Sequence, residues 1–228
     1  MRQIKIPYFC RTKNTKMIRV DSFGFNPFQE NTYILSDETK ECVIIDPGCY
    51  DQQERRILTD FITNEKLFPV RILNTHCHID HVLGNHFVTE KYKLGVEIHT
   101  NEIPILKSLM QVAQMYGVPA EDSPDPTGFL EEGNTIKFGN SVLDILFTPG
   151  HSPGSITFYN KADRFVISGD VLFFQSIGRT DLPGGDFDTL IQSIKEKLFP
   201  LGDDVKVYSG HGPSTMIGFE KKNNPFLQ

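Results

Sequence analysis

The chain has 228 residues, of which 39% are hydrophobic and 23% charged, the composition of a globular domain with enough apolar surface for a sizeable core. Its formal net charge of −6 argues against a nucleic-acid partner, because binding to phosphates needs a surplus of Lys and Arg. No apolar run approaches the roughly 20 residues that a transmembrane helix needs, so the sequence also argues against a membrane partner.

The first sixteen residues are basic and polar. They lack the apolar stretch of a secretory signal, although their positive charges would suit an amphipathic transit peptide. We expect a dispensable N-terminal extension at 1–16, one domain at 17–228 and a cytoplasmic location. The cysteines form no CxxC pair, and a domain of this size needs no disulfide. We therefore expect free thiols at Cys10, Cys42, Cys49 and Cys77.

Short apolar segments rich in β-branched residues, each bounded by Gly, Pro, Asn or Asp, recur along the chain and predict strands. These segments are Met17–Phe23, Thr32–Leu35, Cys42–Ile45, Val70–Leu73, Val96–His99, Val142–Phe147, Ser155–Tyr159, Phe165–Ser168 and Val205–Tyr208. Apolar residues at helical spacing predict helices at Gln52–Asn64, Ile103–Tyr116 and Phe187–Leu198, the last with Asp186 as N-cap. The segment Gly117–Gly128 is rich in Pro, Asp and Glu and indicates an exposed loop. This order predicts an α/β domain of two mixed sheets, packed face to face with helices outside.

A dense cluster of metal-ligand side chains, HxHxDH, follows the predicted strand Val70–Leu73. In extended backbone, residues i and i+2 point to the same side, so His76 and His78 can face one ion. Asp80 and His81 come next, where a turn of the chain can present them to a neighbouring ion. Three His and one Asp in six residues are hard to explain by packing, because a buried charge is costly without a partner. The motif therefore predicts a metal site.

Three further candidate ligands, His151, Asp170 and His211, each follow a predicted strand and have a Gly beside them. Glycine lets the backbone approach an ion closely. Taken singly, each histidine would more often be structural or exposed; their shared position at strand ends favours metal binding. By alternation Cys77 points away from its two histidine neighbours, so we expect it to pack in the core. His86 and His99 lack comparable context.

The motifs THxHxDH, TPGHSPG, SGD and SGHG, in this order and spacing, resemble those of the metallo-β-lactamase superfamily. The resemblance extends from about Met17 to the end of the chain and implies a four-layer αββα sandwich of two mixed sheets flanked by helices. It also places Asp46 near the ligands. The segment 176–185 and the ending around Asn224–Leu227 are similar to short bacterial proteins of the hydroxyacylglutathione hydrolase (glyoxalase II) type. Full-length glyoxalase II carries a C-terminal helical region that helps bind glutathione, whereas seventeen residues follow His211 here.

The resemblance implies two metal ions and assigns their ligands. One ion would take His76, His78 and His151, the other would take Asp80, His81 and His211, and Asp170 would bridge them. We expect Zn, although Fe and Mn suit the same ligands. Two such ions lie roughly 3.5–4 Å apart and lower the pKa of a water between them from about 15.7 to near 7.

The reaction implied is attack of this hydroxide on a small-molecule thioester of the hydroxyacyl-glutathione type, with Asp80 and Asp170 as the catalytic carboxylates. A thiol has a pKa near 8.5, so the thiolate leaves with little help from an acid. Arg179 is a candidate for a substrate carboxylate, and its pairing with Asp181 or Asp186 is an equal alternative. Tyr116 and Met115 are candidate substrate contacts in a pocket wall formed by Ile103–Tyr116; the alternative for Met110 and Met115 is a core position.

Three rival functions are weighed against this one. A serine hydrolase is suggested by the G-x-S-x-G pattern at 150–154, but the residue after Ser152 is Pro153, which has no backbone N–H for an oxyanion hole. A persulfide dioxygenase of the same superfamily would use a single Fe(II) and leave Asp80, His81 and His211 without a role. A non-catalytic metal-binding module would not need an intact ligand set.

Overall fold

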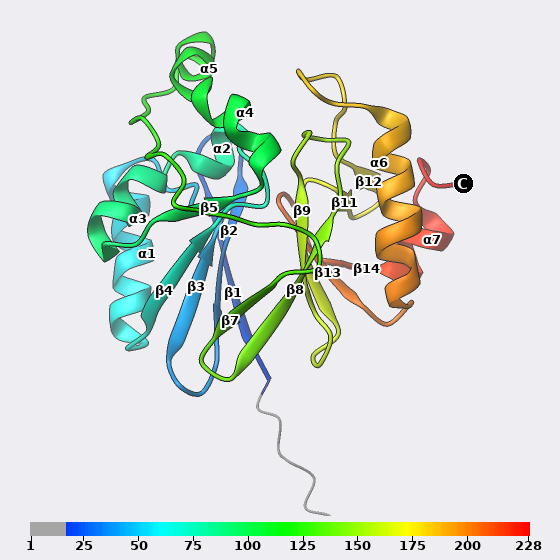
Figure 1. The fold of residues 1–228 in the computed structure, drawn as a ribbon, viewed down its shortest axis with the longest axis horizontal. Coiled ribbons are helices and arrows are strands. Elements are labelled where there is room, and N and C mark those ends of the chain that lie inside the picture. Colours follow the sequence, from blue (N-terminus) through cyan, green and yellow to red (C-terminus); the bar gives the residue numbers. More distant parts are fainter. Residues whose placement is uncertain (1–16) are drawn as a thin grey trace, which may run out of the picture.

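The computed structural model describes residues 17–228, so the predicted extension at 1–16 lies outside the described residues. The described residues form two six-stranded mixed sheets that face each other, and a short separate hairpin (Figure 1). The first sheet has the order β1 (Arg19–Phe25), β2 (Glu30–Ser36), β3 (Glu41–Ile45), β4 (Phe68–Leu73), β5 (Val96–Ile98) and β6 (Gly128–Phe129). The second has the order β14 (Thr215–Met216), β13 (Lys206–Ser209), β10 (Phe165–Gly169), β9 (Ile156–Asn160), β8 (Ser141–Phe147) and β7 (Thr135–Phe138). The hairpin joins β11 (Leu172–Phe173) to β12 (Ser176–Ile177).

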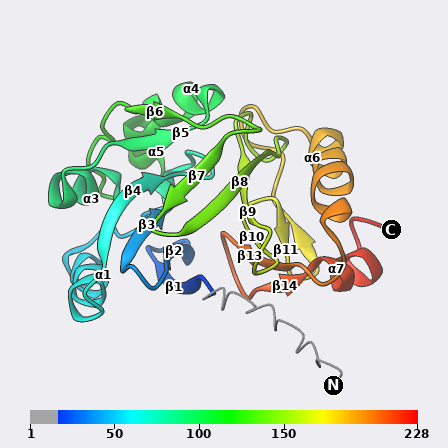
Figure 2. The same cartoon turned by 60° about the horizontal axis from the view of Figure 1, so that its bottom comes forward.

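Helices cover the outer faces of both sheets (Figures 1 and 2). Outside the first sheet lie α1 (Gln52–Asn64) and α3 (Asn85–Tyr92). Outside the second lie α6 (Phe187–Ser193), continued by a π-helical segment at Ile194–Leu198, and α7 (Ile217–Asn223). The upper end in Figure 1 carries α2 (Ile79–Val82), α4 (Ile103–Lys107) and α5 (Leu109–Tyr116), and short 3-10 turns occur at Thr100–Glu102 and Phe199–Leu201. This arrangement confirms the predicted αββα sandwich.

Side-chain alternation along the strands divides the first sheet between two cores. One set of residues faces the second sheet and includes Leu35, Val43 and Leu73. The other set packs with residues of α1 and α3 and includes Ile34 and Ile44. A third core lies between the second sheet and its helices. Because both faces of each sheet are covered, the carboxyl ends of the strands are the positions where a site can open, as is general for α/β folds.

Most predicted elements are present with shifted ends, and α1 has the predicted bounds. The predicted helix Ile103–Tyr116 is instead interrupted at Ser108, whose hydroxyl donates to the Ile105 carbonyl and competes with helical bonding. Asp186 caps α6 as predicted, by accepting from Thr189 N at 2.8 Å. The predictions omitted the four-residue strand β7, the two-residue strands, and the helices α2, α3 and α7. All of these elements are too short for a clear periodic pattern.

Within residues 17–228, every helix is too short or too polar to span a membrane. Cys42, Cys49 and Cys77 are buried and free, as predicted, while Cys10 lies outside the described residues. Burial raises the pKa of the Cys77 thiol well above its ordinary value, which keeps it a protonated packing group.

Candidate metal centre

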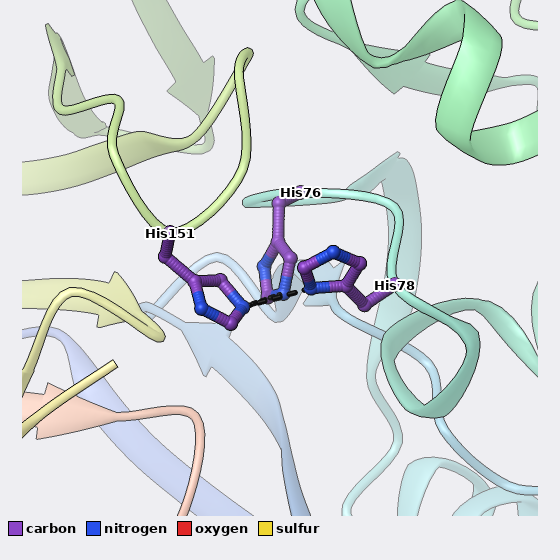
Figure 3. A group of neighbouring side chains, drawn as sticks. All are labelled: His76, His78 and His151. Atoms are coloured by element: carbon purple, nitrogen blue, oxygen red, sulfur yellow. Dashed lines mark hydrogen bonds between the residues drawn. The ribbon is translucent and has the colours of Figure 1, made fainter. Parts of the chain in front are cut away.

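Three histidines converge from loops that follow strands of different sheets (Figure 3). His76 and His78 follow β4, and His151 follows β8. His151 Nε2 lies 2.8 Å from His78 Nδ1 and 3.1 Å from His76 Nε2. Nitrogen ligands about 2.0–2.1 Å from one tetrahedral ion lie ~3.3 Å apart. The three atoms therefore have the spacing of ligands that share an ion, and we call these residues the first group.

A second group consists of Asp80, His81 and His211. The first two lie in α2, directly after the loop that carries the first group, and His211 follows β13. Asp80 Oδ2 lies 3.0 Å from His211 Nε2 and 3.6 Å from His81 Nε2. The short helix thus directs two residues of the HxHxDH motif toward a second position beside the first.

Asp170, which follows β10, lies between the two groups. Its Oδ2 atom is 3.5 Å from His151 Nε2 of the first group and 3.5 Å from His211 Nε2 of the second. Its Oδ1 atom is 3.4 Å from His81 Nε2. A carboxylate at these distances from both groups can bridge two ions.

Two buried atoms support a metal at this position. His81 Nε2 and Asp170 Oδ1 are buried and have no hydrogen-bond partner within the described chain, an arrangement that is costly unless an ion supplies the missing partner. Gly210 keeps this space open, because a Cβ atom there would lie 2.0 Å from Asp170 Oδ1. The donor set of imidazoles and carboxylates suits Zn, Fe or Mn.

Hydrogen bonds on the far side of the rings orient Nε2 of four histidines toward the centre. His151 Nδ1 donates to the Arg179 carbonyl at 2.7 Å, and His211 Nδ1 faces the Gln29 carbonyl at 3.2 Å. His81 Nδ1 lies 3.0 Å from Asp46 Oδ2, and His76 Nδ1 lies 3.1 Å from Thr75 Oγ1.

Asp46 is the hub of these outer contacts. Its carboxylate also accepts from Thr75 N at 2.7 Å and from Thr75 Oγ1 at 2.6 Å. Asp46 lies near His76 and His81, but its oxygens already accept hydrogen bonds, so we expect it to orient the ligands and not to bind an ion itself. Such outer partners fix ring orientation and tautomer in metal sites.

The two groups differ in charge. Burial lowers the pKa of all three histidines of the first group, that of His78 to about 3, so they are neutral and ready to bind a cation. Burial also opposes the charged forms of His81 and His211, but the carboxylates of Asp80 and Asp170 outweigh it. They raise the pKa of His81 well above normal and that of His211 to about 10.

We therefore expect metal binding at the second group to depend more steeply on pH. A proton on His81 or His211 must leave before an ion binds, because both pKa values are raised. At His211 protons therefore compete with the ion at every pH below about 10. The first group needs no such release at neutral pH. Dialysis at pH values from 9 to 5, followed by elemental analysis, should show one equivalent lost well before the other. Simultaneous loss of both ions would contradict this expectation.

A cleft of about 510 Å³ opens onto the metal centre. One wall comes from α4 and α5, where Leu109, Val112 and Tyr116 line the cleft at spacings of three and four residues. Phe28 faces this wall and meets Tyr116 edge to face, with ring centroids 5.5 Å apart. Apart from the two metal-binding groups and Asp170, Arg179 is the one charged side chain among the described residues that line the cleft.

Of the three predicted substrate contacts, two line the cleft and one does not. Tyr116 and Arg179 line the cleft, but Arg179 already forms a two-point ion pair with Asp181, with both bonds at 2.7 Å. Met115 has 78% of its surface exposed and is not among the lining residues described. Consecutive helical residues point about 100° apart, so Met115 cannot share the face of α5 that Tyr116 uses.

The position of Ser152 does not suit a catalytic nucleophile. It is buried, its hydroxyl donates to Glu102 at 2.6 Å, and the segment after it continues into strand β9 rather than a helix. The sequence-based rejection of a serine hydrolase therefore agrees with the structure.

Comparison with known proteins agrees with this architecture. The family model of the metallo-β-lactamase superfamily matches residues 25–211. The probable metallo-hydrolase YqgX of Bacillus subtilis is 43% identical over 204 residues, which cover 88% of this chain and 93% of that protein. The hydroxyacylglutathione hydrolase GloC of Haemophilus influenzae is 41% identical over 220 residues, which cover 92% of this chain and 98% of that protein.

Solved structures of similar proteins share the fold. The B3 metallo-β-lactamase BLEG-1 is 38% identical, with a TM-score of 0.85 over 92% of this chain and 100% of that chain. TTHA1623 in a di-iron-bound form is 38% identical, with a TM-score of 0.83 over 91% of this chain and 100% of that chain. ETHE1 from Myxococcus xanthus is 27% identical, with a TM-score of 0.72 over 92% of this chain and 83% of that chain.

Proposed function

Because the chain belongs to the metallo-β-lactamase superfamily, we propose that it is a two-metal hydrolase that cleaves a small-molecule thioester, as its relative named for hydroxyacylglutathione hydrolysis does. The observation that carries this proposal is the presence of two ligand groups, joined by Asp170, that contribute residues to the lining of one cleft. The di-iron-bound neighbour supports two ions in this fold. We favour Zn among the metals that suit these ligands.

Each group would hold one ion. Divalent ions held there supply an activated water and Lewis acidity at neutral pH. The chain's own part is to hold the ligand atoms in place: Asp170 keeps the groups adjacent, and Asp80 anchors the second group through its contact with His211. Both carboxyl groups have a pKa below their ordinary value. Burial alone would raise it, but in the metal-free chain the positive charge of His81 outweighs burial and keeps both carboxyl groups ionised, ready to bind a cation.

A thioester fits the residues that line the cleft. Outside the two groups and Asp170, the described lining holds no Asp, Glu, His or Lys that could protonate a leaving group. A thiolate needs little such help, because thiols have a pKa near 8.5, whereas an amine or alkoxide leaving group needs a proton. The buried free thiols of Cys42, Cys49 and Cys77 also fit a reducing, cytoplasmic setting.

The proposal is tested by turnover without oxygen. Zn-loaded protein should release thiol from S-lactoylglutathione or a simpler acyl thioester in an anaerobic chamber, and elemental analysis should find two ions per chain. One ion per chain, with no thiol released from any thioester, would overturn the proposal.

A persulfide dioxygenase is the second candidate, and the structural similarity to ETHE1 is the observation that favours it. Such an enzyme would use one iron held by two histidines and a carboxylate, all available in the first group and Asp170. It leaves Asp80, His81 and His211 unexplained. Oxygen consumption with glutathione persulfide, together with one iron per chain, would favour this function.

We expect Tyr116 to contact the substrate. Tyr116→Ala should raise KM about two- to twelvefold, since an aromatic contact contributes ~0.5–1.5 kcal/mol. Thermal stability should change little, because half of the Tyr116 surface is exposed. The matched variant is Met115→Ala, which removes the neighbouring side chain outside the cleft and should leave KM unchanged. Equal changes in the two variants would place the substrate elsewhere.

A further inference from the structure

Glu102 is a buried carboxylate between the two loops that carry the first group. It is 0% exposed and lies at the end of the short turn that leads into α4. Its Oε2 atom accepts from Cys77 N at 2.7 Å. Its Oε1 atom accepts from Ser152 Oγ at 2.6 Å and from Gly154 N at 2.6 Å. One side chain therefore holds both loops.

These contacts lie next to the ligands themselves. Cys77 stands between His76 and His78, and Ser152 directly follows His151. A shift of either loop by a fraction of an ångström would change the distances between the nitrogen atoms, which are 2.8 and 3.1 Å in this structure. Metal ions tolerate little such change, since ligand distances fall within about ±0.2 Å of their preferred values.

The loops are shaped to accept this carboxylate. A Cβ atom at Gly154 would lie 2.7 Å from Glu102 Cγ, so the close approach requires glycine there. Asn101, one residue earlier, adds a bond from its side-chain amide to the Pro153 carbonyl at 3.3 Å. The turn before α4 therefore binds the 150–154 loop at two successive residues.

Burying the Glu102 carboxylate costs free energy that a side chain with only a packing role would not need to cost. No ion pair to Lys or Arg joins Glu102 within residues 17–228. A buried carboxylate without a cation is stabilised only by its hydrogen bonds, and replacing one polar partner leaves the others unsatisfied. We propose that Glu102 is the positioning residue of the first group, holding the His76–His78 loop and the His151 loop at the separation that one metal ion requires.

The inference predicts an asymmetric effect. None of the hydrogen bonds of Glu102 reaches Asp80, His81 or His211, or a residue adjacent to them in the described chain. Loss of the carboxylate should therefore weaken the first group and spare the second. A residue that only stabilises the fold would weaken both groups equally or neither.

The test measures Zn²⁺ affinity by competition with a chromophoric chelator. Glu102→Gln keeps the size of the side chain but turns one acceptor into a donor that faces an N–H or O–H. Each group is isolated in turn: His211→Ala leaves the first group, and His78→Ala leaves the second. Glu102→Gln should weaken binding about 10- to 100-fold in the first background, the usual effect of losing an outer partner. It should leave affinity in the second background unchanged.

The matched control is Glu220→Gln. Glu220 is also fully buried and also accepts three bonds, from Gln175 N, Thr215 Oγ1 and Asn224 Nδ2, but none of these donors is a neighbour of a ligand in the chain. It should lower the thermal stability of the metal-free chain with both affinities kept. Should Glu102→Gln fail to fold, Ser152→Ala removes one donor and should weaken the first group to a smaller degree.

Two results would overturn the inference. One is a folded Glu102→Gln chain with wild-type affinity at the first group. The other is an equal loss of affinity at both groups. The measurement uses Zn²⁺ binding alone, so its outcome stands apart from the identity of the substrate.

Discussion

Asp170→Ala should lower the occupancy of both metal ions and reduce thioester hydrolysis at least about a thousandfold. The carboxylate lies within 3.5 Å of ligand atoms in both groups, so its loss removes a ligand from each. Several kcal/mol of transition-state stabilisation come from a bound ion, and each 1.36 kcal/mol corresponds to a factor of ten in rate. The metal content per chain, measured by elemental analysis, and kcat/KM should fall together. The substitution also removes the carboxylate oxygen that lies 3.4 Å from His81 Nε2.

The matched control is Asp204→Ala. Asp204 is an exposed Asp that pairs with Arg164 near the start of β10, at the strand end opposite Asp170. It should retain two ions and full activity. If Asp170→Ala kept one ion at full occupancy, Asp170 would be a ligand of a single metal and the bridging role would be wrong.

His211→Ala should remove the second ion and lower anaerobic thioester hydrolysis by about a hundredfold, while the first ion stays bound. His211 contributes Nε2 to the second group, 3.0 Å from Asp80 Oδ2, and contacts the first group only through the shared Asp170. The expected loss corresponds to the several kcal/mol that a single ion supplies. Thiol release and metal content measured on the same sample test both expectations.

This variant also separates the two candidate reactions. A one-iron dioxygenase would keep its activity with persulfide when His211 is lost, whereas a two-metal hydrolase would not keep its activity with thioester. His86→Ala serves as the control, because His86 lies in α3 outside both groups. Full thioester hydrolysis by His211→Ala would show that the second ion has no part in the reaction.

The residues that the structure gathers at the metal centre could be predicted because each follows a strand with a local apolar pattern. His76, His151 and His211 follow strands β4, β8 and β13, and glycines mark two of those junctions. The geometry that joins them could not be predicted from local pattern, since His151 and His76 are 75 residues apart and meet only when the sheets pack.

Glu102 had no signal in the sequence. Its partners lie 25 and 50 residues away, and an isolated Glu before a helix usually indicates an exposed N-terminal turn. The break at Ser108 was hidden for a similar reason: the apolar spacing of α4 and α5 continues across it. The sequence left open whether a structural Arg179 would pair with Asp181 or with Asp186, and only the side-chain geometry shows the pair with Asp181; a role of Arg179 toward the substrate stays a prediction.

Each ligand group combines residues that follow a strand of the first sheet with a residue that follows a strand of the second. Each ion would therefore link the two sheets across their interface. The first group becomes complete only after residue 151 has been synthesised, and the second only after residue 211. We therefore expect the ions to bind after the two sheets have packed together. An ion at a thousand times its Kd stabilises the docked state by about 4.1 kcal/mol. A metal-starved chain opens more often at this interface, and proteases act on the open form. We therefore expect metal depletion to shorten the lifetime of this protein.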